Sequence, residues 1–335
     1  MLVRTIGDER LRLTVSGLCL GTMNFGTRTD EATSLAILDR FRDAGGTFLD
    51  TANNYNQWLD NGDGGESEAL IGRWLCSRKA VNSTVVATKA GARTTVSGDV
   101  GREHWEGLTS AAIRKAAEGS LHRLGTERLD LYYAHIDERG VPLEESAGSF
   151  AELAAEGVAG LIGASNITAW RLAEARQLAV GRGWAPYTCV QQMHTYLWPR
   201  PGLEQLYVVG DEMVDYVGAH ADVTLLGYSP LFAGYYSRRN QPPSHATNFI
   251  SNWRRLEVAG TAWDHESSWR RLAVLDEVSD ELGATPNQVI LAWILGSEPS
   301  IIPIFSVSSV PQLEECLGAL EISLAPELRQ RLDSA

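Results

Sequence analysis

The sequence predicts an α/β protein, a (β/α)8 TIM barrel with long loops at the C-terminal face of its strands. Short apolar runs rich in β-branched residues alternate with longer amphipathic stretches along the whole chain, a pattern typical of a parallel sheet. There are eight such runs, the number of strands that closes into a barrel. A single barrel often exceeds the usual domain length, so we expect residues 1–335 to form one domain.

The eight expected strands are Leu18–Gly21, Thr47–Asp50, Val85–Lys89, Leu129–His135, Gly160–Ala164, Thr188–Gln191, Thr224–Tyr228 and Ile301–Phe305. The amphipathic stretches between them, which we expect to form helices, include Glu31–Ala44, Ser67–Leu75, Ser110–Leu124, Leu143–Glu156, Ala169–Leu178 and Glu212–Ala219. The alternative is a doubly wound sheet. It is disfavoured because no Gly-x-Gly-x-x-Gly turn follows the first strand.

One long stretch, Phe232–Ser268, shows no regular periodicity and follows the seventh strand. It carries tryptophans and paired arginines, and it falls on the face where barrel active sites lie. We therefore interpret it as a functional loop. Together with Trp58 and Trp105, it predicts a roomy apolar or sugar-stacking pocket.

Composition excludes several classes of partner. The net charge of −13, from 29 basic and 42 acidic residues, argues against a nucleic acid or an anionic membrane as partner. No apolar run approaches the ~20 residues of a membrane span, and the first residues show no signal-peptide pattern. The four cysteines form no Cys-x-x-Cys pair, which is typical of a reducing compartment. We expect a cytoplasmic protein, and its oligomeric state stays open.

Four polar side chains fall at or just beyond the ends of early strands: Asp50, Tyr55, Lys89 and His135. The C-terminal ends of barrel strands face one shared mouth, so these side chains are expected to converge. Taken singly, a helix cap explains Asp50, packing explains Tyr55 and a hydrogen-bonded core position explains His135. A lysine that ends a buried strand is harder to dismiss, because a buried ammonium needs a partner.

Together the four residues match the needs of carbonyl reduction, which takes a hydride donor and a proton for the developing alkoxide. A phenol has a pKa of about 10, and the ammonium of Lys89 would bring the pKa of Tyr55 nearer neutrality. Asp50 would hold Lys89 charged, and His135 would orient the carbonyl oxygen. A barrel lyase or hydrolase is less well supported, because we find no metal cluster and no paired carboxylates.

Segments along nearly the whole chain resemble the aldo-keto reductases: DTANNY, GGESEALIGRWL, VVATKAG, LGTERLDLYYAH, IGASN and QLEECLGALEISLAPE. The Asp, Tyr, Lys and His tetrad of that family matches Asp50, Tyr55, Lys89 and His135 in order. The resemblance implies reduction of a small carbonyl substrate with NADP(H), less often NAD(H), bound without a Rossmann domain. One branch includes the potassium-channel β-subunits. An alternative is therefore a cofactor-binding regulatory or interaction subunit with slow residual reductase activity.

The resemblance also implies a set of cofactor contacts. Those at the nicotinamide end are Gly21, Thr22, Met23, Asp50, Ser165, Asn166, Gln191 and Tyr228. Those that wrap the diphosphate are Ser229, Pro230, Leu231 and Gly234.

The adenosine end departs from the family pattern. The positions expected there are Ser306, Ser308, Gln312, Glu315 and Cys316. Serines and a cysteine replace the lysine, arginine and asparagine of many relatives, so this segment offers no cation for a 2′-phosphate. We expect Arg239, or Arg254 and Arg255, to supply that charge instead. NADP(H) is favoured over NAD(H), by a modest margin.

Overall fold

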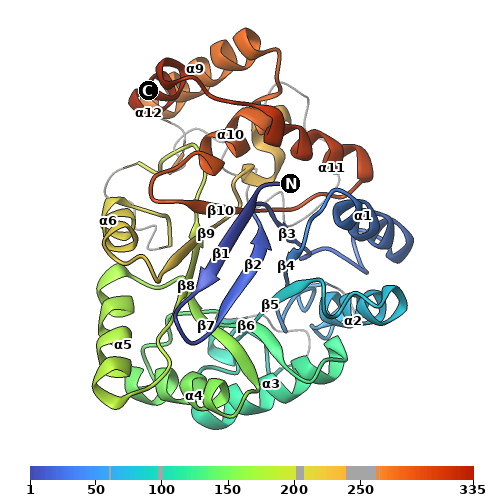
Figure 1. The fold of residues 1–335 in the computed structure, drawn as a ribbon, viewed down its shortest axis with the longest axis vertical. Coiled ribbons are helices and arrows are strands. Elements are labelled where there is room, and N and C mark those ends of the chain that lie inside the picture. Colours follow the sequence, from blue (N-terminus) through green and yellow to red (C-terminus); the bar gives the residue numbers. More distant parts are fainter. Residues whose placement is uncertain (60–61, 97–100, 201–206, 239–261, 264) are drawn as a thin grey trace.

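The strands of the computed structural model close into a barrel in the order β10-β3-β4-β5-β6-β7-β8-β9, all parallel (Figure 1). The barrel strands are β3 (Cys19–Gly21), β4 (Phe48–Asp50), β5 (Val85–Ala90), β6 (Leu129–Ala134), β7 (Ala159–Ser165), β8 (Cys189–Met193), β9 (Thr224–Tyr228) and β10 (Ile301–Phe305). The structure describes residues 1–59, 62–96, 101–200, 207–238, 262–263 and 265–335. The predicted (β/α)8 barrel is confirmed.

Helices surround the barrel on its outer side (Figure 1). They are α1 (Glu31–Asp43), α2 (Glu66–Arg78), α3 (Ser110–Leu124), α4 (Leu143–Ala155), α5 (Ala169–Arg182), α6 (Asp211–Ala219), α10 (Pro286–Leu295) and α11 (Val310–Leu317). Two more, α9 (Glu266–Leu282) and α12 (Pro326–Ser334), pack against each other outside this ring. Short turns of helix complete the described chain: η1 (Arg102–His104), η2 (Phe232–Gly234), α7 (Tyr235–Arg238) and η4 (Gly318–Glu321).

Side-chain caps explain where several of the helices begin. The Asp30 carboxylate accepts from the backbone N–H of Thr33 at the start of α1, and the Thr109 hydroxyl caps α3 in the same way. Thr285 and Gln288 form a reciprocal capping box at the start of α10. These contacts satisfy backbone N–H groups that the helix itself leaves unpaired.

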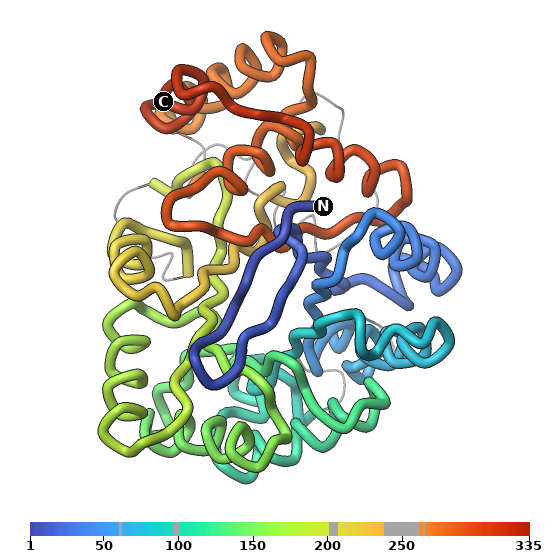
Figure 2. Tube along the Cα trace, viewed as in Figure 1, coloured from blue at the N-terminus to red at the C-terminus, as the bar shows by residue number. Residues whose placement is uncertain are grey.

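An antiparallel hairpin of β1 (Val3–Gly7) and β2 (Arg12–Ser16) precedes the barrel. It lies across one end of the barrel, where the start of the chain in blue passes in front of the strands (Figure 2). Ile6 and Val15 are each 1 % exposed and join the apolar cluster inside the barrel. A Cβ at Gly7 would lie 3.0 Å from the side chain of Leu161, near the start of β7. The hairpin therefore seals the N-terminal end of the barrel, a feature that we did not predict.

The interior of the barrel is filled by side chains. The cluster that Ile6 and Val15 join also contains Cys19, Phe48, Ala87, Leu131, Tyr133, Leu161, Cys189, Leu226, Ile302 and Ile304. A second, larger cluster fills the space between the strands and the helices. Since the interior is a packed core, as is usual for this fold, the C-terminal ends of the strands are left to form a site.

The Phe232–Ser268 stretch is not irregular at its two ends, which corrects the prediction. Helical turns η2 and α7 follow β9 directly, and Ser268 lies within α9. The ring of Phe232 packs on Trp263 with 4.9 Å between centroids. Residues 239–261 and 264, and with them Arg239, Arg254 and Arg255, lie outside the described residues.

No helix in the described part of the chain is long and apolar enough to cross a membrane. Within the same ranges, no group of three or more His, Cys, Asp or Glu side chains could hold a metal ion.

Candidate active site

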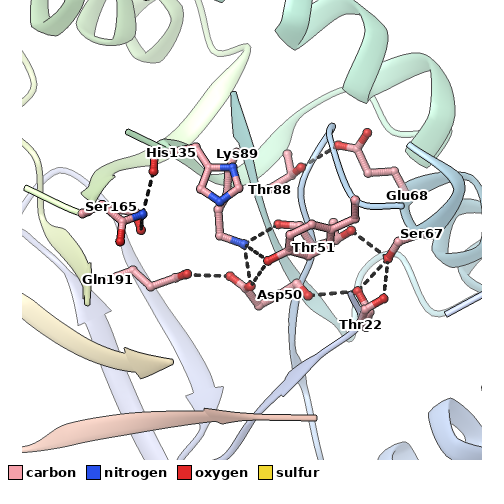
Figure 3. A network of polar contacts seen from close by, with 12 residues as sticks. Thr22, Asp50, Thr51, Ser67, Glu68, Thr88, Lys89, His135, Ser165 and Gln191 are labelled. Atoms are coloured by element: carbon pink, nitrogen blue, oxygen red, sulfur yellow. Dashed lines mark hydrogen bonds and ion pairs between the residues drawn. The ribbon is translucent and has the colours of Figure 1, made fainter. Parts of the chain in front are cut away.

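The four side chains singled out by the sequence meet at the C-terminal end of the barrel. Asp50 is the last residue of β4, Lys89 lies near the end of β5, and His135 directly follows β6. Tyr55 is carried by the turn after β4. Figure 3 shows Lys89 pointing toward Asp50, with His135 at the end of the neighbouring strand.

Lys89 is the centre of this group. Its side chain is 0 % exposed, and Nζ donates to Asp50 Oδ1 (2.6 Å), to the Thr51 carbonyl (2.7 Å) and to the Tyr55 hydroxyl (2.8 Å). An ammonium has three N–H donors, so all of them are used. Burial disfavours the charged form, but the nearby Asp50 and Tyr55 outweigh it and raise the pKa of Lys89. The side chain is therefore a charged ammonium at neutral pH.

Tyr55 keeps its proton at neutral pH. Burial raises the pKa of Tyr55 to about 12, although Lys89 acts to lower it. We expected Lys89 to bring the pKa of Tyr55 nearer neutrality. Its effect is smaller than the cost of burying the charged phenolate, which raises this pKa. The Tyr55 oxygen accepts from Lys89, while its own proton faces Asp50 Oδ1 at 3.5 Å, beyond the usual range for an O–H donor. The proton is therefore present, and its contact with Asp50 is long for a hydrogen bond.

His135 lies beside the phenol as a neutral imidazole. Its ring stands edge-on to that of Tyr55, with 6.2 Å between centroids and 74° between planes. Burial, with Lys89 in second place, lowers the pKa of His135 well below 6.5. Nδ1 is buried and has no hydrogen-bond partner among the described residues. A neutral imidazole has one N–H, and this group can donate a hydrogen bond to a carbonyl oxygen.

The residues expected at the nicotinamide end lie around the same mouth. The Tyr228 hydroxyl donates to Asn166 Oδ1 (2.9 Å), and Asn166 Nδ2 donates to the His135 carbonyl (2.9 Å) and to Ser165 Oγ (3.2 Å). Asn166 has a left-handed φ of 55°, which is uncommon outside glycine. The structure thus brings Ser165, Asn166, Tyr228 and His135 together.

Gln191 also lies at this mouth, on β8, and its side chain is buried. Its Nε2 donates to Asp50 Oδ2 at 2.8 Å. The sequence did not indicate this contact.

The turn after β3 approaches the site closely. Thr22 is buried, and its hydroxyl donates to the Asp50 carbonyl at 2.9 Å, while Met23 is partly exposed. A Cβ at Gly21 would lie 2.7 Å from Ser306 Oγ, so a larger residue at this position would require the Ser306 side chain to move. Ser306, one of the residues expected at the adenosine end of the cofactor, is exposed beside the mouth.

The start of α2 ties the strand ends together, a role that sequence reasoning missed. Ser67 Oγ donates to the Thr22 carbonyl (2.9 Å) and accepts from Thr51 Oγ1 (2.9 Å), as Figure 3 shows. Thr22 and Thr51 directly follow β3 and β4. The Ser67 hydroxyl therefore holds the residues that follow both strands. One of them, Thr51, is the residue whose carbonyl accepts a hydrogen bond from Lys89.

Glu68 serves β5 in the same way. It is 0 % exposed, accepts from Thr88 Oγ1 (2.5 Å), the residue before Lys89, and pairs with Arg123 Nε (2.7 Å). The signal available in the sequence was the GGESE segment. However, acidic residues at the start of a helix are usually exposed, so the sequence did not predict that Glu68 is buried.

Glu106 holds the turn that carries Tyr55. Its Oε1 accepts from the backbone N–H of Gly91 (2.7 Å) and from Asn53 Nδ2 (2.8 Å). Burial raises the pKa of Glu106 above its usual range. The carboxylate links the loop after β5 to the residues just before Tyr55.

The loop expected to wrap the diphosphate has an unusual backbone. Ser229 (φ 55°), Phe232 (48°), Ala233 (55°) and Gly234 (81°) all occupy the left-handed region. Non-glycine residues in this region are strained, and such residues cluster at ligand clamps. Pro230 and Leu231 are buried within the same loop.

The adenosine set is only partly brought together. Gln312 Oε1 accepts from the backbone N–H and the hydroxyl of Ser308, at the start of α11. Glu315 Oε1 accepts from Thr285 Oγ1 (2.8 Å) and Asn287 Nδ2 (3.2 Å), on the side facing α10. Cys316 was expected to contact the adenosine end of the cofactor. Its side chain is instead buried in the core, with 2 % exposed, so the thiol does not face a ligand.

Comparison with known proteins decides the family. The model of the Aldo/keto reductase family matches residues 17–335, which leaves out only the N-terminal hairpin. The chain belongs to the aldo/keto reductase family. The resemblance stated from the sequence is confirmed. This aldo/keto reductase is therefore an oxidoreductase that acts on the carbonyl groups of small molecules with a nicotinamide cofactor.

Curated relatives of this aldo/keto reductase span bacteria and fungi. The chain is 31 % identical over 325 residues to the uncharacterized oxidoreductase YrpG of Bacillus subtilis, covering 97 % of this chain and 93 % of that protein. It is 29 % identical to the norsolorinic acid reductase stcV of Emericella nidulans (93 % and 76 % covered). It is 30 % identical to norsolorinic acid reductase B of Aspergillus parasiticus (96 % and 81 % covered).

Proposed function

We propose that residues 1–335 act as one barrel domain that reduces an aldehyde or ketone with NAD(P)H, with Tyr55 as the general acid. The observation that carries the proposal is the position of Lys89, whose buried ammonium joins Asp50 Oδ1 at 2.6 Å and the Tyr55 hydroxyl at 2.8 Å. An ammonium in this position stabilises the phenolate that remains after proton transfer.

Each residue has a distinct part in the proposed reaction. When bound, the reduced nicotinamide supplies the hydride. His135 donates its N–H to the carbonyl oxygen and so orients it, and Tyr55 transfers its proton to that oxygen. Lys89 stabilises the resulting phenolate, and Asp50 keeps Lys89 charged and in place. Tyr55 is suited to the acid role because it is protonated at neutral pH and its proton has no close acceptor among the described residues.

The residues around the mouth fit a nicotinamide nucleotide. Asn166, Ser165 and Tyr228 form a hydrogen-bonded group beside His135, as amide recognition requires. The left-handed loop from Ser229 to Gly234 supports a diphosphate site, because runs of turn-forming backbone make concave sites for anions. We propose that these groups hold the nicotinamide and the diphosphate respectively, with Gly21, Thr22 and Met23 closing the nicotinamide end.

We propose a modest preference for NADP(H). Ser306 and Ser308 are exposed but carry no charge for a 2′-phosphate. A serine hydroxyl can donate a hydrogen bond to the phosphate but brings no positive charge to it, whereas an arginine supplies both charge and bidentate hydrogen bonds. The preference would therefore depend on Arg239, or on Arg254 and Arg255.

The substrate is proposed to be a carbonyl compound with an extended apolar or sugar-like body. Trp58 is partly exposed and stands edge-on to Tyr55, with 6.3 Å between ring centroids. Relatives are named for the reduction of norsolorinic acid, which supports a natural-product intermediate. An activity screen over norsolorinic acid, keto-sugars, aromatic aldehydes and α-dicarbonyls would identify the class.

Replacing Tyr55 by phenylalanine tests the proposal. Tyr55→Phe should lower turnover by about 10²–10⁴-fold, the range for a positioned acid, while the Kd for NADPH stays the same. Tyr132→Phe is a matched control, because it removes a buried hydroxyl that bonds the Ile113 carbonyl at 3.2 Å, away from the four residues. If Tyr55→Phe keeps more than half of wild-type turnover, Tyr55 is not the acid.

A further inference from the structure

The two carboxylate oxygens of Asp50 have different partners on opposite sides of the barrel. Oδ1 accepts from Lys89 Nζ (2.6 Å), on the adjacent strand, and Oδ2 accepts from Gln191 Nε2 (2.8 Å). Gln191 lies on β8, four strands away from β4 in either direction around the closed barrel. Figure 3 shows the side chain of Gln191 pointing toward Asp50. The carboxylate is therefore held from both sides.

Burial makes this second contact energetically important. Asp50 is 2 % exposed and Gln191 is 3 % exposed, so water does not take the place of either partner. Removing a donor from a buried anion costs more than removing one from a neutral group. The terminal torsion of an aspartate has a broad energy minimum. Without a partner on Oδ2, the carboxylate is free to turn and to weaken its contact with Lys89.

The residue type also matters at position 191. An amide donates a hydrogen bond without adding charge, so it fixes the carboxylate and leaves Lys89 as its counter-charge. A second cation would compete with Lys89 for Asp50, and an anion would repel it. Gln192, the next residue on β8, points to the other face of the strand and donates to the Ile167 carbonyl.

We propose that Gln191 is a positioning residue for the proton donor: it fixes Asp50 through Oδ2, so that Oδ1 holds Lys89 against the Tyr55 hydroxyl. This role is additional to the cofactor contact expected from the family resemblance. It deepens the proposed function, since it rests on the roles proposed for Asp50 and Lys89.

A double-mutant cycle on the full chain, purified without nucleotide, tests the contact independently of turnover. The free energy of unfolding is measured for wild type, Gln191→Leu, Asp50→Asn and the double variant. We expect the effect of Gln191→Leu on the unfolding equilibrium to be at least tenfold smaller when Asp50 is already asparagine, because contacting residues are not additive. Gln192→Leu is the matched control. It removes a buried amide from the same strand and should be additive with Asp50→Asn.

A pH profile of Gln191→Glu tests the consequence for catalysis. Two carboxyls that share a site bind a proton between them with a raised pKa. While that proton is bound, the introduced carboxyl donates to Asp50 as the amide does. Once it is lost, two anions compete for Lys89. We therefore expect kcat of Gln191→Glu to fall at least tenfold between pH 6 and pH 9, with less than threefold change in wild type.

The outcomes separate this inference from the proposed function. A coupling below threefold in the cycle, or a Gln191→Glu profile parallel to wild type, overturns the positioning role even if Tyr55→Phe abolishes turnover. A large coupling together with a fully active Tyr55→Phe would leave the contact intact and refute the proposed acid instead. If Asp50→Asn does not fold, the pH profile decides.

Discussion

Replacing Lys89 by methionine removes the ammonium but keeps an unbranched side chain of similar length. Nζ makes three hydrogen bonds in a fully buried position. Its loss leaves Asp50 as a buried anion with Gln191 Nε2 (2.8 Å) and the more distant Tyr55 hydroxyl (3.5 Å) as described side-chain donors. Breaking a buried ion pair on one side costs about 3–5 kcal/mol. For a chain of 335 residues the entropy of unfolding is about 0.7 kcal/mol/K, so the Tm of Lys89→Met should fall by about 4–7 °C.

Thermal unfolding followed by circular dichroism, with NADPH oxidation in the presence of a simple aldehyde, measures both effects. Turnover of Lys89→Met should drop by about 10²-fold or more, because the phenolate left by Tyr55 loses its counter-charge. The double variant Asp50→Asn/Lys89→Met is the control. It removes both charges and should regain most of the stability but none of the turnover. A Lys89→Met protein with wild-type Tm and wild-type turnover would refute this reasoning.

Three further predictions concern stability, nucleotide choice and loop position. Burial lowers the pKa of His194 to about 4. The unfolded chain therefore binds the proton first, and His194 contributes a loss of about 3 kcal/mol of stability as pH falls from about 6.5 to 4; in urea unfolding, His194→Gln should lack this share of the loss and keep the share that comes from His135. The ratio of kcat/KM for NADPH over NADH should be below a thousandfold and should shrink in Arg239→Ala; a larger ratio that survives the substitution would place the phosphate site elsewhere. Glu106→Ala should lower stability by about 1–3 kcal/mol by leaving the Gly91 N–H unsatisfied, and should lower kcat by displacing Asn53, whereas Glu106→Gln should keep both.

Much of the barrel could be predicted because its strands are short, apolar and β-branched. The expected bounds of β9 and β10 agree with the structure, and those of the other barrel strands differ by at most two residues. Helix α3 also has its expected bounds, since Thr109 caps its start and Gly125 ends it in the left-handed conformation. The four polar side chains were recognisable because each lies near the end of such a strand or shortly after it.

Other elements carried no periodic signal. Helix α10 is apolar on nearly every side, with eight of its residues from Asn287 to Leu295 buried, so it has no amphipathic stripe to reveal it. The β1–β2 hairpin lies outside the alternation of strands and helices that identified the barrel.

Contacts between distant segments could not be predicted either. Gln191 and Asp50 are 141 positions apart, and nothing in the order of residues indicates that their side chains meet. The buried state of Glu68 depends on Arg123 and Thr88, which come from two other elements. Cys316 was placed at the adenosine end by its position in a motif, but the inward face of α11 carries it into the core.

The hairpin that seals the barrel has a consequence for how Tyr55, the proposed proton donor, regains its proton. Ile6 and Val15 close one end, apolar side chains fill the interior, and Lys89 is out of reach of solvent. Within the described residues, the barrel interior therefore offers water no path to the phenol of Tyr55, which is left open to the mouth, where we propose that the substrate binds. In the reaction that we propose, the phenolate left by Tyr55 regains its proton from bulk solvent after the alcohol has departed. Product departure and reprotonation are then coupled events, and the active site is reset only once its mouth is open.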